Sequence, residues 1–184
     1  MIKPLITIYI TNHNYGRFIS KSINSVLNQS FKKYELIIID DGSTDNSIDI
    51  INKYCKKNKD IIFIKQNKRG LVASNNIAIN LAKGRYIVRL DADDWLKSDA
   101  LKEMFKAIEI NNKIAMVFPD YYEVDIYGRI ISRFVRHNFK KVNLKDQPAH
   151  GACSLIRLSI LKKIGGYDEK FMCQDGYYIW MKLL

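Results

Sequence analysis

Short apolar runs alternate with amphipathic segments along the first two thirds of the chain, and this alternation limits the fold more than any other feature. β-Branched or apolar runs of strand length occur at 5–10, 34–39, 61–65, 86–90 and 115–118. Segments with helical spacing lie between them, at 16–28, about 43–54, 71–82 and about 99–110. Strands and helices that alternate at this spacing predict a mostly parallel sheet with helices on both faces.

Local signals suggest where some of these elements begin and end. Ser43 or Thr44 is suited to cap the second helix, with Asp45 in its first turn. Gly84 follows the third helix and is expected to close it in the left-handed conformation. These residues therefore predict where two of the helices begin or end.

The last third of the chain has a different pattern. Residues 121–126 and 129–135 alternate around Tyr127-Gly128, which predicts a hairpin. Residues 136–149 are polar and basic and predict a loop, and 153–157 predict a strand. A short helix at 158–164, stopped by Gly165-Gly166, and a final helix at 174–184 complete the expectation, so the sheet should gain a short antiparallel part.

Acidic residues follow two of the predicted strands. Asp40-Asp41 end the second strand, and Asp91, Asp93 and Asp94 end the fourth. Because ligands bind beyond the carboxyl ends of parallel strands, both clusters should converge there, where their repulsion requires a cation or hydrogen-bond donors. Asp91 and Asp93 are spaced i, i+2 and, on an extended exit, would point to one side and suit Mg²⁺ or Mn²⁺. The alternative is a set of acids that simply favours a helix N-terminus.

The charge, cysteine content and apolar runs of the chain limit its expected partners and location. The net charge of +11 fits anionic partners such as nucleotide diphosphates or phospholipid headgroups, or else a lysine-rich, solvated surface. No basic block is interleaved with aromatic residues, so nucleic acid is not an expected partner. Three scattered cysteines argue against a disulfide framework and a zinc site. No apolar run reaches the ~20 residues of a membrane-spanning helix, and a cytoplasmic protein is expected.

Three longer segments carry a family resemblance. ITIYITNHNYGRFISKSINSVLNQSFKKYELIIIDDGSTDNS at 6–47, NKRGLVASNNIAINLAKGRYIVRLDADD at 67–94 and GGYDEKFMCQD at 165–175 resemble the family 2 glycosyltransferases, which adopt the GT-A fold. The resemblance implies transfer of a sugar from a nucleotide-diphosphate donor, most simply a UDP-sugar, to an acceptor hydroxyl. It further implies inversion by direct displacement, with Mn²⁺ or Mg²⁺ as cofactor.

The same resemblance implies roles for residues at the strand ends. Thr11 and His13 match the loop that touches the nucleotide base, although an aromatic Tyr is common where His13 stands. Asp41 matches the carboxylate that accepts a hydrogen bond from the base. Arg69, with Gly70, matches the segment near the diphosphate and ribose.

The acidic cluster also acquires roles from the resemblance. Asp93 matches a residue that contacts both ribose and metal, Asp94 matches a metal contact, and Asp91 completes the D-x-D pattern. All three are therefore expected metal ligands, and Asp93 is also an expected nucleotide contact.

On the acceptor side, Asp175 matches the general base of inverting members. It also stands where a helix N-cap would, so a purely structural role is the alternative. Gln174 replaces a common Glu. His150, Gly151 and Ala152 fall where relatives line the acceptor pocket.

The resemblance divides the chain into a nucleotide-sugar-binding half, 1–119, and an acceptor-binding or catalytic half of the same domain, 120–184, which can be truncated at its C-terminus. The expected acceptor is a saccharide or lipid-linked saccharide, with a peripheral contact to an anionic membrane at its inner face. The alternatives are a truncated or non-catalytic nucleotide-binding module and a sugar nucleotidyltransferase. The second is disfavoured because the loop after the first strand contains one glycine.

Overall fold

The predicted elements form in the predicted order in the computed structural model, which describes residues 3–135, 151–170 and 175–183. The strands are β1 (Ile6–Asn12), β2 (Tyr34–Asp41), β3 (Ile61–Gln66), β4 (Tyr86–Asp91), β5 (Met116–Val117), β6 (Tyr121–Val124), β7 (Ile130–Phe134) and β8 (Leu155–Arg157). The helices are α1 (Ile19–Leu27), α2 (Ser47–Lys57), α3 (Leu71–Leu81), α4 (Ala100–Glu109), α5 (Leu158–Lys163) and α6 (Asp175–Leu183).

The main sheet contains six strands within the described residues, in the order β3-β2-β1-β4-β8-β5. Strands β1 to β4 pair in parallel, whereas β8 is antiparallel to both β4 and β5. This confirms the mostly parallel sheet with a short antiparallel C-terminal part. The strand order also brings the carboxyl ends of β1, β2 and β4 side by side.

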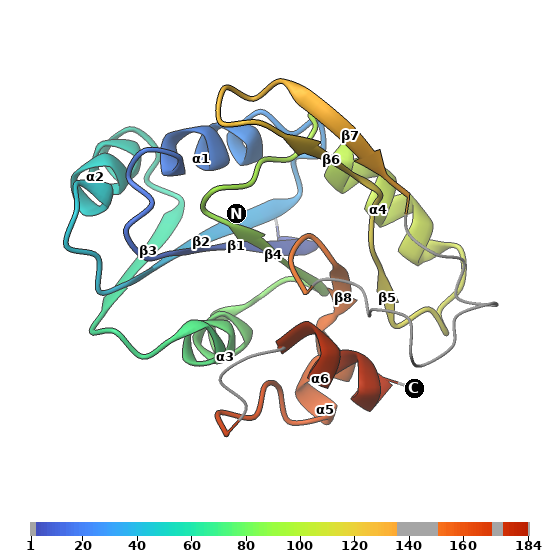
Figure 1. The fold of residues 1–184 in the computed structure, drawn as a ribbon. Coiled ribbons are helices and arrows are strands. Elements are labelled where there is room, and N and C mark those ends of the chain that lie inside the picture. Colours follow the sequence, from blue (N-terminus) through green and yellow to red (C-terminus); the bar gives the residue numbers. More distant parts are fainter. Residues whose placement is uncertain (1–2, 136–150, 171–174, 184) are drawn as a thin grey trace.

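Helices cover both faces of the sheet (Figure 1). One core layer joins the sheet to α1, α2 and α4, through residues such as Ile23, Ile51 and Leu101. The other joins it to α3, α5 and α6, for example through Ile79 and Leu161. Because successive strand residues face opposite layers, this double cover explains why the central strands are apolar on both sides.

Two predicted helix ends are wrong. Helix α2 begins at Ser47, after Asn46, and neither Ser43 nor Thr44 caps it. Ser43 is instead engaged by Asp40, which accepts its hydroxyl at 2.6 Å. Asp45 precedes the helix rather than lying in its first turn, and it accepts the N–H of Ser47 at 2.9 Å.

Gly84 is not a left-handed cap. Helix α3 is followed by Ala82 in an extended conformation. A Cβ at Gly84 would lie 2.5 Å from the backbone N of Thr7 and 2.8 Å from the carbonyl carbon of Ile6. Glycine is therefore required here by the close approach of strand β1, not by a turn.

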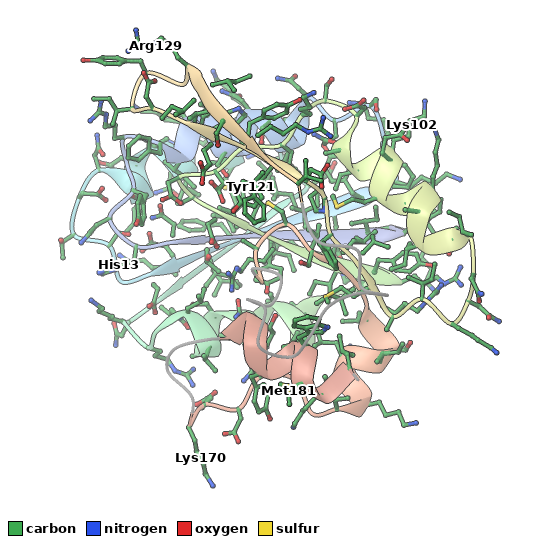
Figure 2. All side chains as sticks on the ribbon, turned by 45° about the vertical axis from the view of Figure 1, so that its right-hand side comes forward. His13, Lys102, Tyr121, Arg129, Lys170 and Met181 are labelled. Atoms are coloured by element: carbon green, nitrogen blue, oxygen red, sulfur yellow. The ribbon has the colours of Figure 1, made fainter. Side chains whose placement is uncertain are left out.

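The predicted hairpin is confirmed as β6 and β7, which form a separate two-stranded sheet over α1 and α4 (Figure 1). Its turn holds Gly128 at φ 82°, and Arg129 lies at its outer end (Figure 2). Large apolar side chains on the hairpin are well exposed, including Ile126, Tyr127 and Ile131. The predicted loop at 136–149 lies outside the described residues. Within the described part, no helix has the length and apolar character needed to cross a membrane.

Candidate functional site

The strand ends place Thr11, Asp41 and Asp91 on the same face of the sheet. Thr11 is paired with Asp91 across β1 and β4, and Ile39, two residues before Asp41, is its partner on β2. Ile39 belongs to the core layer on the α3 side, so Asp41 continues on that face. Thr11 Oγ1 lies 3.3 Å from Asp91 Oδ1, which places these two predicted residues in direct contact.

Asp41 is buried and receives three hydrogen bonds. Its Oδ1 accepts the side-chain N–H of Gln66 and the backbone N–H of Arg69, both at 2.7 Å, and its Oδ2 accepts the backbone N–H of Gly70 at 2.9 Å. These contacts attach the segment before α3 to the tip of β2. The predicted nucleotide-binding residues Asp41 and Arg69 are thus brought together, because the backbone N–H of Arg69 binds the Asp41 carboxylate.

His13 joins the same group. Its Nδ1 lies 2.9 Å from the carbonyl oxygen of Asp41. A carbonyl oxygen only accepts, so Nδ1 carries the proton in this contact, and Nε2 of the neutral ring is left as an acceptor. Figure 2 shows His13 at the edge of the sheet, in the loop that follows β1.

Asp40 faces the opposite side of the sheet from Asp41, and its carboxylate is bound by neighbouring protein groups. It is fully buried and accepts hydrogen bonds from Asn12 Nδ2 at 2.8 Å and from the backbone and hydroxyl of Ser43. Asp40 therefore ties the loops after β1 and β2 together.

The acidic cluster after β4 forms a turn. The N–H of Asp94 donates to the carbonyl oxygen of Asp91 at 3.0 Å, so the expectation of an extended exit is wrong. Asp91 Oδ1 also lies 3.0 Å from Nε of Arg89, a side chain that is 2% exposed. Asp91 is therefore the counter-ion of a buried arginine, while Asp93 and Asp94 are exposed at the turn.

A divalent ion would find a limited set of ligands here. The described residues contain no group of three or more His, Cys, Asp and Glu side chains that could hold a metal. Asp93 and Asp94 are nevertheless hard oxygen donors accessible to solvent, and Mg²⁺ commonly takes one or two carboxylates with water and substrate phosphates. The residues present fit an ion of that kind, and they do not form a closed protein cage.

The acceptor-side predictions are only partly covered by the structure. Asp175 is the first residue of α6. Gly151 is half-buried and Ala152 is buried, close to the strand β8 that continues the sheet. His150 and Gln174 lie outside the described residues.

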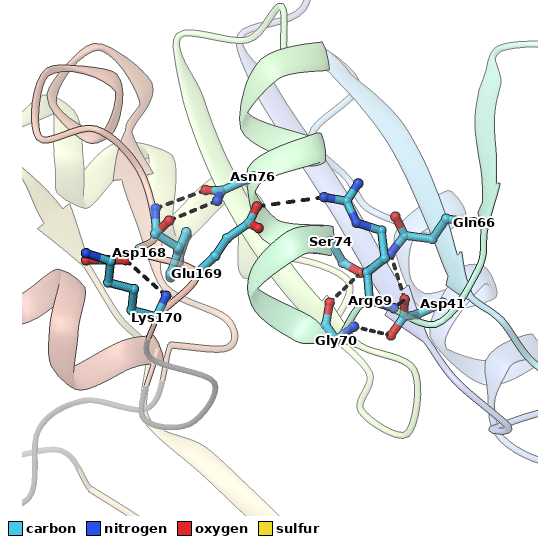
Figure 3. Close-up of polar contacts among 10 residues, drawn as sticks. Asp41, Gln66, Arg69, Gly70, Ser74, Asn76, Asp168, Glu169 and Lys170 are labelled. Atoms are coloured by element: carbon cyan, nitrogen blue, oxygen red, sulfur yellow. Dashed lines mark hydrogen bonds and ion pairs between the residues drawn. The ribbon is translucent and has the colours of Figure 1, made fainter.

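Sequence reasoning missed two groups. Arg89 is a charged residue inside the apolar run YIVRLD, and that signal was available in the sequence. Asn76 of α3 contacts Tyr167, and Arg69 lies 3.9 Å from Glu169 through Nη2 and Oε1 (Figure 3). These contacts join segments about half a chain apart, and nothing in the local sequence marks them.

The sequence matches one known family over most of its length. A family model described as "Glycosyl transferase family 2" matches residues 7–165. An uncharacterised glycosyltransferase of Methanocaldococcus jannaschii is 33% identical over 192 residues, covering 100% of this chain and 66% of the relative. The chondroitin synthase of Pasteurella multocida is 34% identical over 181 residues, covering 98% of this chain and 19% of the synthase.

Solved structures share the fold. S. aureus TarS 1-349 in complex with UDP superposes with a TM-score of 0.76 at 20% identity, covering 97% of this chain and 54% of TarS. The mannosyltransferase PcManGT from Pyrobaculum calidifontis, in complex with GDP-Man and Mn²⁺, gives 0.77 at 19% identity and covers 98% and 52%. These likenesses confirm the GT-A-type fold. The chain spans less than two thirds of each of these proteins.

Proposed function

Because the chain belongs to glycosyl transferase family 2, we propose that it transfers a sugar from a nucleotide-diphosphate donor, most simply a UDP-sugar, to an acceptor hydroxyl. The observation that carries this proposal is the convergence of Thr11, His13, Asp41 and Asp91 with the Arg69–Gly70 segment at one edge of the sheet. TarS was solved with UDP, and a likeness to it supports a donor of that class.

The base of the donor would lie against Thr11, His13 and Asp41. A carboxylate has about four acceptor sites, and Asp41 uses three of them within the protein, so one is left for an N–H of the base. The Nε2 acceptor of His13 can receive a second hydrogen bond. Arg69, whose side chain is 54% exposed, supplies a positive charge that favours the diphosphate.

Asp93 and Asp94 would hold Mn²⁺ or Mg²⁺ together with donor phosphate oxygens and water. When bound, the ion supplies positive charge that stabilises the departing diphosphate. Asp91 contributes differently, because its contact with Arg89 and its carbonyl contact with Asp94 fix the turn that carries the other two carboxylates.

Asp175 would act as the general base. Its carboxylate takes the proton of the acceptor hydroxyl while the acceptor oxygen forms a bond to the anomeric carbon. The bond from that carbon to the diphosphate oxygen breaks in the same step, and the configuration inverts. The position of Asp175 at the start of α6, and the match of its segment to the family pattern, support this role.

The acceptor would be a saccharide or a lipid-linked saccharide. A lipid-linked acceptor brings the protein to an anionic membrane, and the net charge of +11 with the exposed apolar hairpin supports a peripheral contact. Co-sedimentation with anionic and with neutral liposomes tests this. Preferential binding to anionic liposomes is expected, and equal partitioning would remove the membrane contact.

Turnover of a panel of UDP-sugars with saccharide acceptors tests the chemistry. Asp175→Asn should keep UDP affinity within about twofold of wild type and lower turnover by about a hundredfold or more, since general bases typically contribute 10²–10⁴-fold. Asp60→Asn is a matched control. Asp60 is exposed and directly precedes β3, so it lies at the amino end of that strand, away from the carboxyl ends that form the candidate site. Near-normal turnover of Asp175→Asn would exclude its role as base.

A further inference from the structure

Helix α3 is joined to a distant segment by a reciprocal pair of hydrogen bonds. The Nδ2 of Asn76 donates to the carbonyl oxygen of Tyr167 at 2.8 Å, and Oδ1 of Asn76 accepts the N–H of Tyr167 at 3.0 Å (Figure 3). One side-chain amide thus satisfies both backbone groups of a single residue 91 positions away. Alanine, serine or leucine cannot make this pair of contacts.

The chain around Tyr167 is shaped to fit this contact. Gly166 has φ 69°, and a Cβ there would lie 2.9 Å from Oδ1 of Asn76, so the glycine permits the close approach. Tyr167 is 5% exposed and packs in the core layer that contains α3 and α6. Backbone conformation, packing and hydrogen bonding therefore all fix the segment at the same place.

The N-terminal end of α3 carries the donor-side contacts. Asp41 holds the backbone of Arg69 and Gly70, and Gln66 donates to Ser74 Oγ at 2.9 Å. Asn76 lies six residues beyond Gly70, about 9 Å along the helix at ~1.5 Å per residue. The helix is thus a short, rigid connection between the donor-side residues and the segment that contains Tyr167.

A second contact joins the donor-side segment to the segment that contains Tyr167. Arg69 Nη2 lies 3.9 Å from Oε1 of Glu169, and both side chains are more than half exposed. This exposed pair contributes little energy of its own. It does place Glu169, two residues after Tyr167, directly beside the segment that Asp41 holds.

We propose that Asn76 is a positioning residue of the transferase site: its amide fixes the 165–170 segment, which leads into α6 and its first residue Asp175, relative to the donor-side segment. The inference rests on the proposed function, because it assigns Asn76 an effect on turnover through Asp175. It predicts that loss of the amide changes the transfer step and leaves the donor contacts in place.

The first test compares Asn76→Ala with Asn80→Ala. Asn80 lies one turn further along α3 and is exposed, so it is a matched control. UDP affinity is measured by calorimetry with Mn²⁺, and turnover is measured as UDP released from UDP-glucose and UDP-GlcNAc. We expect Asn76→Ala to keep UDP affinity within about twofold and to lose about tenfold or more in turnover, whereas Asn80→Ala matches wild type in both.

The second test uses Asn76→Asp and keeps the proposal falsifiable if the alanine variant folds poorly. A carboxylate accepts from the N–H of Tyr167 but repels its carbonyl oxygen, whereas a protonated carboxyl donates and accepts as the amide does. The turnover of Asn76→Asp relative to wild type should therefore rise as the pH falls from about 8 to about 4.5, towards the ordinary carboxyl pKa. The ratio for Asn76→Ala should stay flat.

The outcomes separate the two proposals. An active wild type with normal turnover in Asn76→Ala, or with a flat pH ratio in Asn76→Asp, would overturn the role of Asn76 and leave the proposed function intact. A wild type that neither binds UDP nor releases it from a sugar donor would overturn the proposed function, and the role of Asn76 with it.

Discussion

Asp41 Oδ2 accepts the backbone N–H of Gly70 at 2.9 Å, so a carboxylate at the tip of β2 holds the residue that directly precedes α3. The same carboxylate receives the N–H of Arg69 and the side-chain N–H of Gln66. A residue expected from the sequence to contact the nucleotide base therefore also builds the loop that would contact the diphosphate.

Asp41→Asn should weaken both folding and nucleotide binding. An amide keeps one acceptor oxygen but turns an NH₂ group towards an N–H donor, and hydrogen bonds to charged groups are each worth about 1.5–3 kcal/mol. We expect the free energy of unfolding to fall by about 2 kcal/mol or more in urea, with UDP affinity lowered at the same time. Unchanged stability would contradict the structural role of these hydrogen bonds.

Replacement of Asp91 by asparagine should lower stability, whereas the same replacement of Asp93 should lower metal affinity. Asp91→Asn removes the negative charge 3.0 Å from Nε of the buried Arg89, and we expect a loss of about 2 kcal/mol, below the ~3–5 kcal/mol typical of fully buried pairs because Asp91 is 26% exposed. Asp93→Asn, at an exposed position, should change stability by less than about 0.5 kcal/mol. It should instead lower Mn²⁺ affinity, measured directly by electron paramagnetic resonance of the free ion. Equal effects of both variants on stability would contradict this division of roles.

Much of the fold could be predicted because its signals are local. Runs such as LITIYI and YELIII are β-branched and end at polar residues, so strand ends and the position of Asp41 follow from sequence. The role of Gly84 could not be predicted, since it depends on the approach of Thr7, 77 residues away. The pairing of Asn76 with Tyr167 could not be predicted for the same reason, because the sequence around a helical asparagine does not indicate which distant residue it contacts.

Arg157 should be one of the stabilising residues of the antiparallel part. Its buried guanidinium donates to the carbonyl oxygens of Ile114, Ile108 and Asn111 and to the hydroxyl of Tyr86. Arg157→Met would leave these carbonyl groups without that donor, and we expect a loss of about 2–4 kcal/mol in the free energy of unfolding.

Arg129→Met is the control, because Arg129 is exposed at the hairpin and its ion pair with Asp125 should matter by less than about 1 kcal/mol. A similar cost for both substitutions would contradict the structural role of Arg157.

Asp45 should make stability sensitive to acid. Burial acts to raise its pKa, but hydrogen bonds from Ser47 and from the N–H of Gly16 outweigh that effect, and the pKa is lowered below 3.8. A carboxyl with a lowered folded-state pKa stabilises the fold above its unfolded pKa and loses that contribution as the pH falls towards the folded value. The stability difference between wild type and Asp45→Asn should therefore be constant near neutral pH and shrink below about pH 4. Urea unfolding at a series of pH values measures it, and a difference that grows on acidification would show the opposite sign.

Calorimetric titration of the wild-type protein with UDP, with and without Mn²⁺, addresses the claim on which the proposed function depends. Mn²⁺ should raise UDP affinity by about tenfold or more, since it offsets the repulsion between the diphosphate and the carboxylates of Asp93 and Asp94. Binding that is absent, or equally weak with and without the ion, would contradict a metal-assisted nucleotide-diphosphate site at these strand ends.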